Sequence, residues 1–298
     1  MSFPTTAAPS LTTWQISYQG LTLGPGTPYA LTGITGFAQP NLGFGDITRP
    51  RDVGEIIGLD FYDGRDILIS GDIVPDSTSL THAIQALATS TNRTIADPGT
   101  EYPLWINYPN VGTIGSMVRL RKRDLPIDLQ HVAGLASMNL QFHATDPRWY
   151  TTPSNLSTGL GTPGSGLSFN VGFNASFGGG GVGGFLTATN AGNYETRPIL
   201  TITGPCINPS VTNVTTGQSV AFGLTMATGD KLVIDTDFRS ATYTTSGSTI
   251  ASSRLGSLIA GSTWFTLAPG SSTIQFQTQD SSAVAATLQV QFASAYIF

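Results

Sequence analysis

Residues 228–243 read Thr-Gly-Asp-Lys-Leu-Val-Ile-Asp-Thr-Asp-Phe-Arg-Ser-Ala-Thr-Tyr, and this stretch decides the fold of the second half of the chain. Gly229-Asp230 is a turn signal, and residues 232–234 form a short β-rich run that we expect to be buried on both faces. Short polar side chains follow from Asp235 and break the strand, because they prefer to hydrogen-bond their own backbone. Residues 241–244 begin a second strand, so the stretch predicts two strands separated by a polar turn.

The rest of the second half repeats this rhythm and leaves no room for a helix. Apolar and polar side chains alternate in it, which is typical of half-buried strands. The expected strands are residues 199–203, 219–225, 231–235, 264–267, 273–278 and 287–292. They predict an antiparallel β-sandwich, a fold that more often presents surfaces than carries out chemistry.

The first half also reads mainly as strands, with one hairpin signal. Residues 55–62 and 66–74 are joined by Asp63-Gly64-Arg65, and Asp-Gly supplies the positive φ angles of a tight turn, so we expect these two runs to pair as a hairpin. Further strands are expected at residues 14–18, 29–37, 104–107, 116–123 and 135–144. Residues 41–51 form a loop long enough to reach a neighbouring subunit.

One helix is predicted in the first half. Its apolar residues fall at i, i+3, i+4, i+7 and i+8, which gives a single apolar stripe: Leu80, Ala83, Ile84, Leu87 and Ala88. We expect Asp76 or Ser77 to cap this helix and the helix to end near Asn92. The fold class is therefore mainly β, with an N-terminal β-barrel or β-sandwich domain that carries one α-helix and a C-terminal antiparallel β-sandwich.

Two domains are expected in a chain of 298 residues, although one large all-β domain would also fit this length. Residues 151–166 shift to Pro, Ser, Thr and Gly, which bury too little apolar surface to fold alone. We therefore predict an N-terminal domain at 1–150, a linker at 151–166 and a C-terminal domain at 167–298. The linker includes Gly-Leu-Gly-Thr-Pro-Gly (159–164), which matches a dinucleotide-binding pattern but lacks the flanking strand and helix that such a site needs.

Composition excludes several classes of protein. Charged residues are only 10% of the chain and the net charge is −5, which argues against nucleic-acid binding because phosphates require clustered Lys and Arg. The single cysteine, Cys206, leaves no intrachain disulfide and no cysteine metal cluster. The first residues lack the pattern of a signal peptide, and no apolar run approaches the ~20 residues that span a membrane. We expect a protein made in the cytoplasm and released inside an assembled particle.

Candidate catalytic and metal-binding groups have simpler explanations. Asp60, Asp63 and Asp66 lack the spacing of a calcium loop, so turn chemistry is favoured. Asp235 and Asp237 could in principle form a glycosidase pair, but a close pair at a strand end is more often a solvated turn. The three histidines, His82, His131 and His143, have no metal-binding spacing. We expect no catalytic residue, no metal and no cofactor.

The only basic cluster lies in residues 119–123. Strand geometry places Arg119, Arg121 and Arg123 on one face, with Val118, Leu120 and Lys122 on the other. The cluster would suit either phosphate binding or a plain exposed strand face or subunit contact, and the acidic chain favours the second.

Four stretches together resemble the distal tail protein family of long-tailed bacteriophages, in particular minor tail proteins of phages that infect actinobacteria. They are Asp-Pro-Arg-Trp-Tyr (146–150), Asn-Ala-Gly-Asn-Tyr-Glu-Thr-Arg-Pro (190–198), Gly-Asp…Ile-Asp-Thr (229–236) and Trp-Phe-Thr-Leu-Ala-Pro-Gly-Ser-Ser (264–272). They cover most of the second half and the end of the first.

The resemblance implies a non-enzymatic tail-tip hub in the virion. Its N-terminal domain would close into a ring, expected to be hexameric, and a galectin-like sandwich would lie outside it. The ring would join the tail tube protein to the baseplate or host-recognition proteins, with DNA only in transit and no membrane insertion. Because a channel that conducts DNA should not hold it, we expect the residues 119–123 to face away from the lumen.

Two alternatives remain open from the sequence. The sandwich could bind carbohydrate during host attachment, and the candidate contacts are the aromatics Tyr194, Tyr243 and Trp264, since sugar faces stack on rings. For Trp264, which lies between Thr263 and Phe265 in an expected strand, a core position is favoured. Against it, the chain ends soon after Phe292, which leaves no space for the carbohydrate-binding inserts of some relatives. The other alternative is a secreted glycoside hydrolase, which would need two carboxylates at a defined separation.

Overall fold

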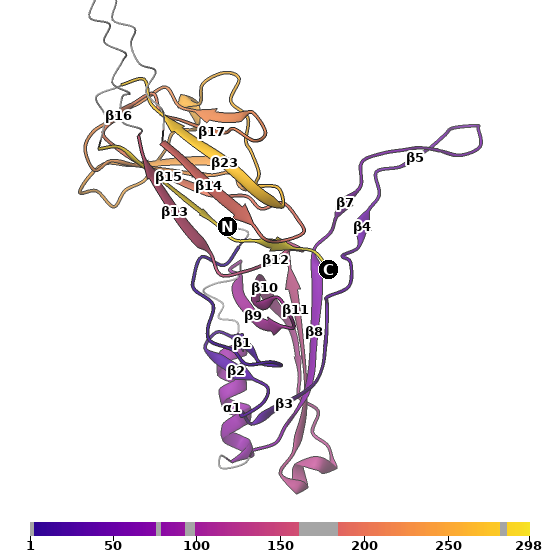
Figure 1. Cartoon of the computed structure of the whole chain (residues 1–298). Helices are drawn as coiled ribbons and strands as arrows, with labels where there is room; N and C mark the ends of the chain where they lie inside the picture. The colour runs from indigo at the N-terminus through magenta and orange to yellow at the C-terminus, as the bar shows by residue number, and fades with distance from the viewer. Residues whose placement is uncertain (1–2, 76–78, 93–98, 161–183, 281–284) are drawn as a thin grey trace, which may run out of the picture. The chain divides into compact units, whose positions relative to one another are not determined.

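The computed structural model describes residues 3–75, 79–92, 99–160, 184–280 and 285–298. Within them the chain is mainly β with one α-helix, so the predicted fold class is confirmed (Figure 1). Backbone contacts divide the chain into two compact units. We call residues 2–153 together with 295–298 the N-terminal unit, and residues 154–294 the C-terminal unit.

A nine-stranded antiparallel sheet forms the N-terminal unit. Its main path runs β2 (Leu21–Leu23), β1 (Ile16–Tyr18), β9 (Tyr102–Tyr108), β10 (Gly112–Asp124), β11 (Ala136–Ala144), β8 (Arg65–Ile73) and β3 (Tyr29–Thr35). β12 (Trp149–Tyr150) pairs with both β10 and β25 (Ala295–Tyr296). The last residues of the sequence therefore complete the sheet that the first residues begin.

The α-helix α1 (Leu80–Thr91) packs on this unit through one stripe, as its spacing predicts. Ala83 and Leu87 are buried in the core, and the Tyr29 hydroxyl donates a 2.8 Å hydrogen bond to the Ala83 carbonyl. The helix ends at Asn92 as expected, but Ser79 is its N-cap and its hydroxyl accepts from the His82 amide. Because Ser79 is the N-cap, the prediction that Asp76 or Ser77 caps the helix is corrected. Asp76 and Ser77 themselves lie outside the described residues.

The predicted hairpin about Asp63-Gly64 does not form. β8 pairs with β11 and β3, whereas β7 (Phe61–Tyr62) pairs with β4 (Leu42–Gly43). Gly64 has no positive φ; instead, a Cβ there would lie 2.8 Å from the Ala144 carbonyl oxygen. This glycine is needed for a close approach between strands and not for a tight turn.

The pairing of β4 with β7 continues into that of β5 (Ile47–Thr48) with β6 (Glu55–Ile56). We call residues 41–62 the arm. Figure 1 shows it as a narrow ribbon that extends from the sheet of its own unit. Gly45 and Gly58 lie so close together that a Cβ at Gly58 would overlap the Gly45 backbone. The loop expected at residues 41–51 is thus one side of a two-stranded element.

Two antiparallel sheets enclose the core of the C-terminal unit. One has the order β13 (Ser154–Gly159), β24 (Thr287–Phe292), β15 (Ile199–Thr203), β20 (Lys231–Asp235), β21 (Ser240–Thr244) and β22 (Ser252–Ser253). The other has the order β14 (Gly184–Asn190), β23 (Gly270–Gln277), β17 (Ser210–Asn213) and β18 (Gln218–Ala221). Two short strands, β16 (Cys206–Ile207) and β19 (Thr225–Met226), pair with each other. The predicted antiparallel β-sandwich is confirmed.

Two expectations about this unit need correction. Residues 154–159, placed in the linker, form β13 and pair along their whole length with β24, because backbone pairing needs little apolar surface. Residues 232–234 are not buried on both faces: Leu232 and Ile234 are buried, whereas Val233 is only half-buried. β20 therefore follows the alternation of a strand with one core-facing side. The remainder of the predicted linker, residues 161–166, lies outside the described residues.

Candidate functional site

The arm exposes seven large apolar side chains. Val53 and Ile57 are each 91% exposed, and Phe44 is 72% exposed. The full set comprises Phe44, Ile47, Val53, Ile56, Ile57, Leu59 and Phe61. Single exposed apolar residues are common on protein surfaces, whereas seven on one two-stranded element make that element a candidate interaction site.

Arg65 holds the two ends of the arm at its root. The guanidinium donates to the carbonyls of Gly36, Ala38 and Pro147, at 3.0 Å for Ala38 and 2.9 Å for Pro147. Burial lowers the pKa of Arg65 to about 10, although the nearby Asp146 carboxylate acts in the opposite direction. One cation thus ties the chain entering the arm, the chain leaving it and the 146–150 stretch.

The Asp-Pro-Arg-Trp-Tyr stretch that supported the family resemblance is structural. Asp146 accepts hydrogen bonds from the Arg148 backbone amide, from Arg148 Nε at 2.8 Å and from the Tyr150 hydroxyl at 2.7 Å. Arg148, Trp149 and Tyr150 are all buried. The Asp146 carboxylate therefore provides hydrogen-bond partners for a buried cation and a buried phenol, both of which would be costly to bury unpaired.

An aromatic cluster lies beside this stretch. Phe37 stacks on Trp149 with ring centroids 4.9 Å apart, and Tyr108 stacks on Phe298 at 4.6 Å. Phe298 also lies 5.8 Å from Tyr296. The cluster fixes Phe37 and Tyr108 in place, and both of these rings also line a pocket.

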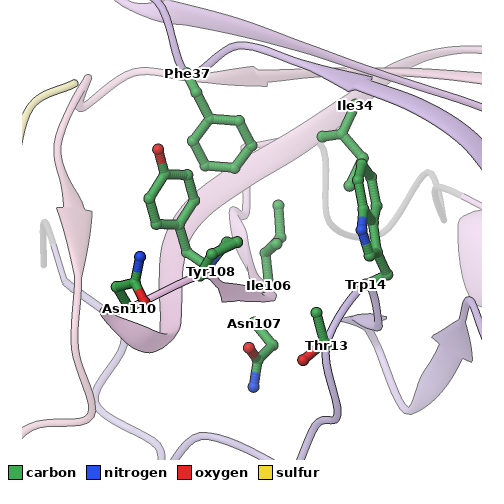
Figure 2. A pocket seen from close by; sticks show the side chains of 9 residues that line it. Thr13, Trp14, Ile34, Phe37, Ile106, Asn107, Tyr108 and Asn110 are labelled. Atoms are coloured by element: carbon green, nitrogen blue, oxygen red, sulfur yellow. The ribbon is translucent and has the colours of Figure 1, made fainter.

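The pocket has a volume of about 340 Å³ and belongs entirely to the N-terminal unit. Figure 2 shows Trp14 and Ile34 facing Phe37 and Tyr108 across it, with Ile106 between. Its lining comprises Thr13, Trp14, Ile34, Phe37, Ile106, Asn107, Tyr108, Pro109 and Asn110, none of which is charged. Its size is that of a small ligand site, and its chemistry suits an apolar group.

Trp14 is the least expected residue of the pocket. It is 54% exposed and adopts a left-handed backbone conformation with φ 67°, which is unusual for a bulky side chain. The local turn holds it there: the Gln15 amide donates to the Thr12 carbonyl, and the Thr12 amide donates to Gln15 Oε1. Strained residues concentrate at functional sites, so this conformation is itself a signal. The alternation at 14–18 predicts only a half-buried strand, and no sequence pattern indicates the pocket.

The three aromatics expected to contact sugar do not share one exposed surface. Tyr243 is buried, and its hydroxyl donates to the buried carboxylate of Asp230, so its ring has no free face for stacking. The expectation that Tyr243 is exposed is therefore wrong. Tyr194 and Trp264 are half-buried, and Trp264 packs against the core of the sandwich.

The Asp235 and Asp237 pair forms a turn and an ion pair. Asp235 Oδ1 accepts from the backbone amides of Asp237 and Phe238 at 2.9 and 3.1 Å. Asp237 binds Arg197 at 2.8 Å. These contacts match the turn interpretation over a glycosidase pair. In the part of the chain that the structure describes, no group of His, Cys, Asp and Glu could hold a metal ion.

A β-bulge changes the predicted faces of the basic cluster. The β10–β11 register shifts between Leu120 and Lys122, so Arg119 pairs with His143 whereas Arg123 pairs with Leu140. Arg123 consequently turns to α1 and donates to the Ala88 carbonyl and to Thr91 Oγ1. The prediction that three arginines share a face is wrong because a bulge inverts the alternation that follows it. Arg119 binds Glu101 and Lys122 binds Asp124, so neither is left as a bare charge.

Cys206 behaves as a buried apolar residue. It lies in the sandwich core with its sulfur 3.6 Å from the sulfur of Met226, and burial raises the pKa of its thiol to about 11. The thiolate is therefore scarce at neutral pH. Across the described ranges, no helix has the length and apolar character needed to cross a membrane.

The chain is similar to known phage tail proteins in sequence and in fold. Residues 191–296 match the family described as "Siphovirus-type tail component, C-terminal domain". No curated protein matches the sequence. Among solved structures, the chain is similar to the Dit protein of phage SPP1, described as a paradigm of the hub adsorption apparatus in phages that infect Gram-positive bacteria. That match has 12% identity and a TM-score of 0.61, and it covers 94% of this chain and 98% of that one.

A second similar structure is a chain of the phage P2 baseplate in its activated conformation with Ca. It has 12% identity and a TM-score of 0.53, and the match covers 93% of this chain and 96% of that one. The resemblance to distal tail proteins is thereby confirmed. Residues 191–296 are thus similar to the C-terminal domain of siphovirus-type tail components, and the fold of the chain is similar to that of the SPP1 Dit protein.

Proposed function

We propose that this chain is the distal tail hub of a long-tailed phage, a structural virion protein without enzymatic activity. Copies form a ring, hexameric in our proposal, that joins the tail tube to the baseplate or host-recognition proteins and lets DNA pass. The observation that carries this proposal is the fold likeness to the SPP1 Dit protein over 94% of the chain, together with the family match of residues 191–296.

The exposed arm supports self-assembly. Each of its seven large apolar side chains is more than half exposed, and apolar surface of this kind is what an interface between copies would bury. Three of the four basic side chains at residues 119–123 are engaged within their own unit, which supports passage of DNA without retention: Arg119, Lys122 and Arg123. We retain the prediction that this cluster faces away from the lumen.

Mass photometry of the purified chain tests the assembly, followed by electron microscopy of the product. We expect a closed ring of six copies that occupies the distal end of the tail tube in intact particles. A chain that stays monomeric at every concentration, or that occupies a position outside any ring in a virion map, would contradict the proposal.

Carbohydrate binding by the sandwich is the alternative function. Tyr194 and Trp264 remain its candidate contacts, whereas burial removes Tyr243. A glycan array decides it: a signal that Trp264→Ala abolishes would favour the alternative, and a blank array would remove it.

A further inference from the structure

We infer that the pocket around Trp14 binds the apolar arm of a second copy of this chain. This inference rests on the proposed function, since it names the contact through which copies would assemble. The first step is the chemistry of the pocket. Its lining has no charged side chain and combines Trp14, Phe37 and Tyr108 with Ile34 and Ile106, so it favours an apolar guest over an ion or a charged peptide.

The second step is the supply of such a guest. Within the described residues, the two most exposed large apolar side chains are Val53 and Ile57 of the arm, both at 91% exposure, and five further exposed apolar side chains lie on the same element. A charged guest would leave an unpaired ion in the pocket, which is costly. Ile57 and its apolar neighbours carry no such penalty, so the arm and the pocket are complementary.

The third step excludes the arm of the same copy. Phe37 lies in the pocket wall only five residues before β4, so the pocket is next to the root of its own arm. Residues 43–52 extend about 30 Å in strand geometry. The tip of an arm therefore lies far from its own pocket, and Arg65 holds the root in place.

The fourth step concerns symmetry. The arm and the pocket are different surfaces, so a contact between them is head-to-tail. Head-to-tail contacts between identical copies form closed rings when the rotation closes. When the contact passes from each copy to the next it fits a ring, whereas two copies that exchanged arms would form a two-fold dimer of distinct mass.

The test uses two single-cysteine variants with different tags, Ile57→Cys on the arm and Thr13→Cys at the pocket, mixed and treated with a short bis-maleimide. Native Cys206 is buried, so it does not compete. We expect a crosslinked product that contains both tags. Ile250→Cys, which replaces a residue 80% exposed on the C-terminal unit, is the matched control for Ile57→Cys.

Three outcomes separate the inference from the proposed function. Rings with the Ile57–Thr13 crosslink well above the Ile250 control support the inference. Rings in which that crosslink does not exceed the control overturn it and leave the proposed function standing. Absence of any assembly overturns the proposed function and the inference with it.

A second variant tests the pocket directly. Trp14→Asn removes the ring, and Asn tolerates the left-handed conformation, so the local turn should survive. We expect assembly to weaken at least about tenfold, because aromatic anchors dominate interfaces. Phe238→Asn removes an exposed aromatic from a turn of the other unit and should leave assembly unchanged. Assembly of Trp14→Asn at parental concentration, with an unchanged melting temperature, would overturn the inference.

Discussion

Asp230 and Tyr243 form a buried pair in which each group shifts the pKa of the other. Hydrogen bonds from Tyr243 and from the amides of Ser246 and Ala227 lower the pKa of Asp230 below its usual 3.8. The same hydrogen bond to Asp230, with burial, raises the pKa of Tyr243 to about 12. The two shifts make the stability of the C-terminal unit depend on pH at both extremes.

The signs follow from the charge of each group. The Asp230 carboxylate contributes its stabilisation above pH 3.8, and this is lost as pH falls through the lower pKa of the folded state. The Tyr243 phenol contributes below pH 10, and this is lost as pH rises from 10 to about 12. We expect Asp230→Asn to remove the acid dependence and Tyr243→Phe to remove the alkaline one, measured by hydrogen exchange at β20 and β21. An unchanged alkaline profile in Tyr243→Phe would contradict this.

Arg123 acts on α1 and not on a ligand. Its guanidinium meets the last turn of the helix, where carbonyl groups lack partners and the helix dipole favours a cation. We expect Arg123→Ala to lower the free energy of unfolding of the N-terminal unit by about 1–2 kcal/mol. Denaturant unfolding measures this.

Lys122→Ala is the matched control for Arg123→Ala. The Lys122 side chain is exposed and pairs with Asp124 at 3.6 Å, so its truncation should change the free energy of unfolding by less than about 0.5 kcal/mol. Equal effects of the two variants would show that Arg123 does not stabilise the helix end.

The sequence could predict residue roles only where they depend on near neighbours. Asp235 was identified as a turn residue because its partners lie two and three positions ahead. The burial of Tyr243 depends on Asp230, thirteen residues away, and the inward turn of Arg123 depends on a bulge that shifts the register against β11. Neither leaves a local pattern in the chain.

At the scale of elements, we expect the arm to be needed for self-assembly but not for folding of the N-terminal unit. β4 and β7 already pair at its root, through Leu42 with Tyr62 and Gly43 with Phe61. Replacing residues 44–60 with Asn-Gly should therefore close a short hairpin of favourable turn type. We expect this variant to keep the melting temperature of the N-terminal unit and to lose self-assembly, as measured by scanning calorimetry and mass photometry.

The comparison for the arm is a variant of the same length. Replacing Val53, Ile57 and Leu59 with Ser keeps the ribbon and removes exposed apolar surface. It should assemble as poorly as the shortened chain. A shortened chain that still forms rings would show that the arm is dispensable for assembly.

Elements were predictable when their pairing was sequential. The strands 231–235 and 240–244 are neighbours in both sequence and sheet, so turn residues and alternation sufficed. The arm was not predictable in this way, because β8 pairs not with the neighbouring β7 but with β11, which begins more than sixty residues later. Likewise β13 has one half-buried apolar residue, Leu156, and its partner β24 is more than a hundred residues away. Composition alone therefore predicted a linker.

At the scale of the molecule, the last four residues of the sequence belong to the unit that begins it. β25 pairs with β12, and Phe298 packs on Tyr108 and Phe37. We expect deletion of residues 295–298 to destabilise the N-terminal unit by about 2 kcal/mol, from lost aromatic contacts and strand pairing. Hydrogen exchange resolved by unit measures this, and protection in β20 and β24 should not change.

Phe298→Leu is the milder comparison. It retains an apolar side chain but removes the ring, so its effect should be smaller than that of the deletion. Loss of protection in the C-terminal unit instead of the N-terminal one would contradict the division of the chain.

The return of β25 to the first sheet has a consequence during synthesis. A ribosome releases residues 2–153 long before it releases residues 295–298, so the nascent first unit waits with an unfilled strand position while the whole sandwich is translated. The aromatic cluster of Phe37 and Tyr108 gains the Phe298 ring only when translation reaches residue 298. Translation products that stop before residue 295 would thus lack both β25 and this ring, and on the docking contact inferred above we expect them to assemble poorly.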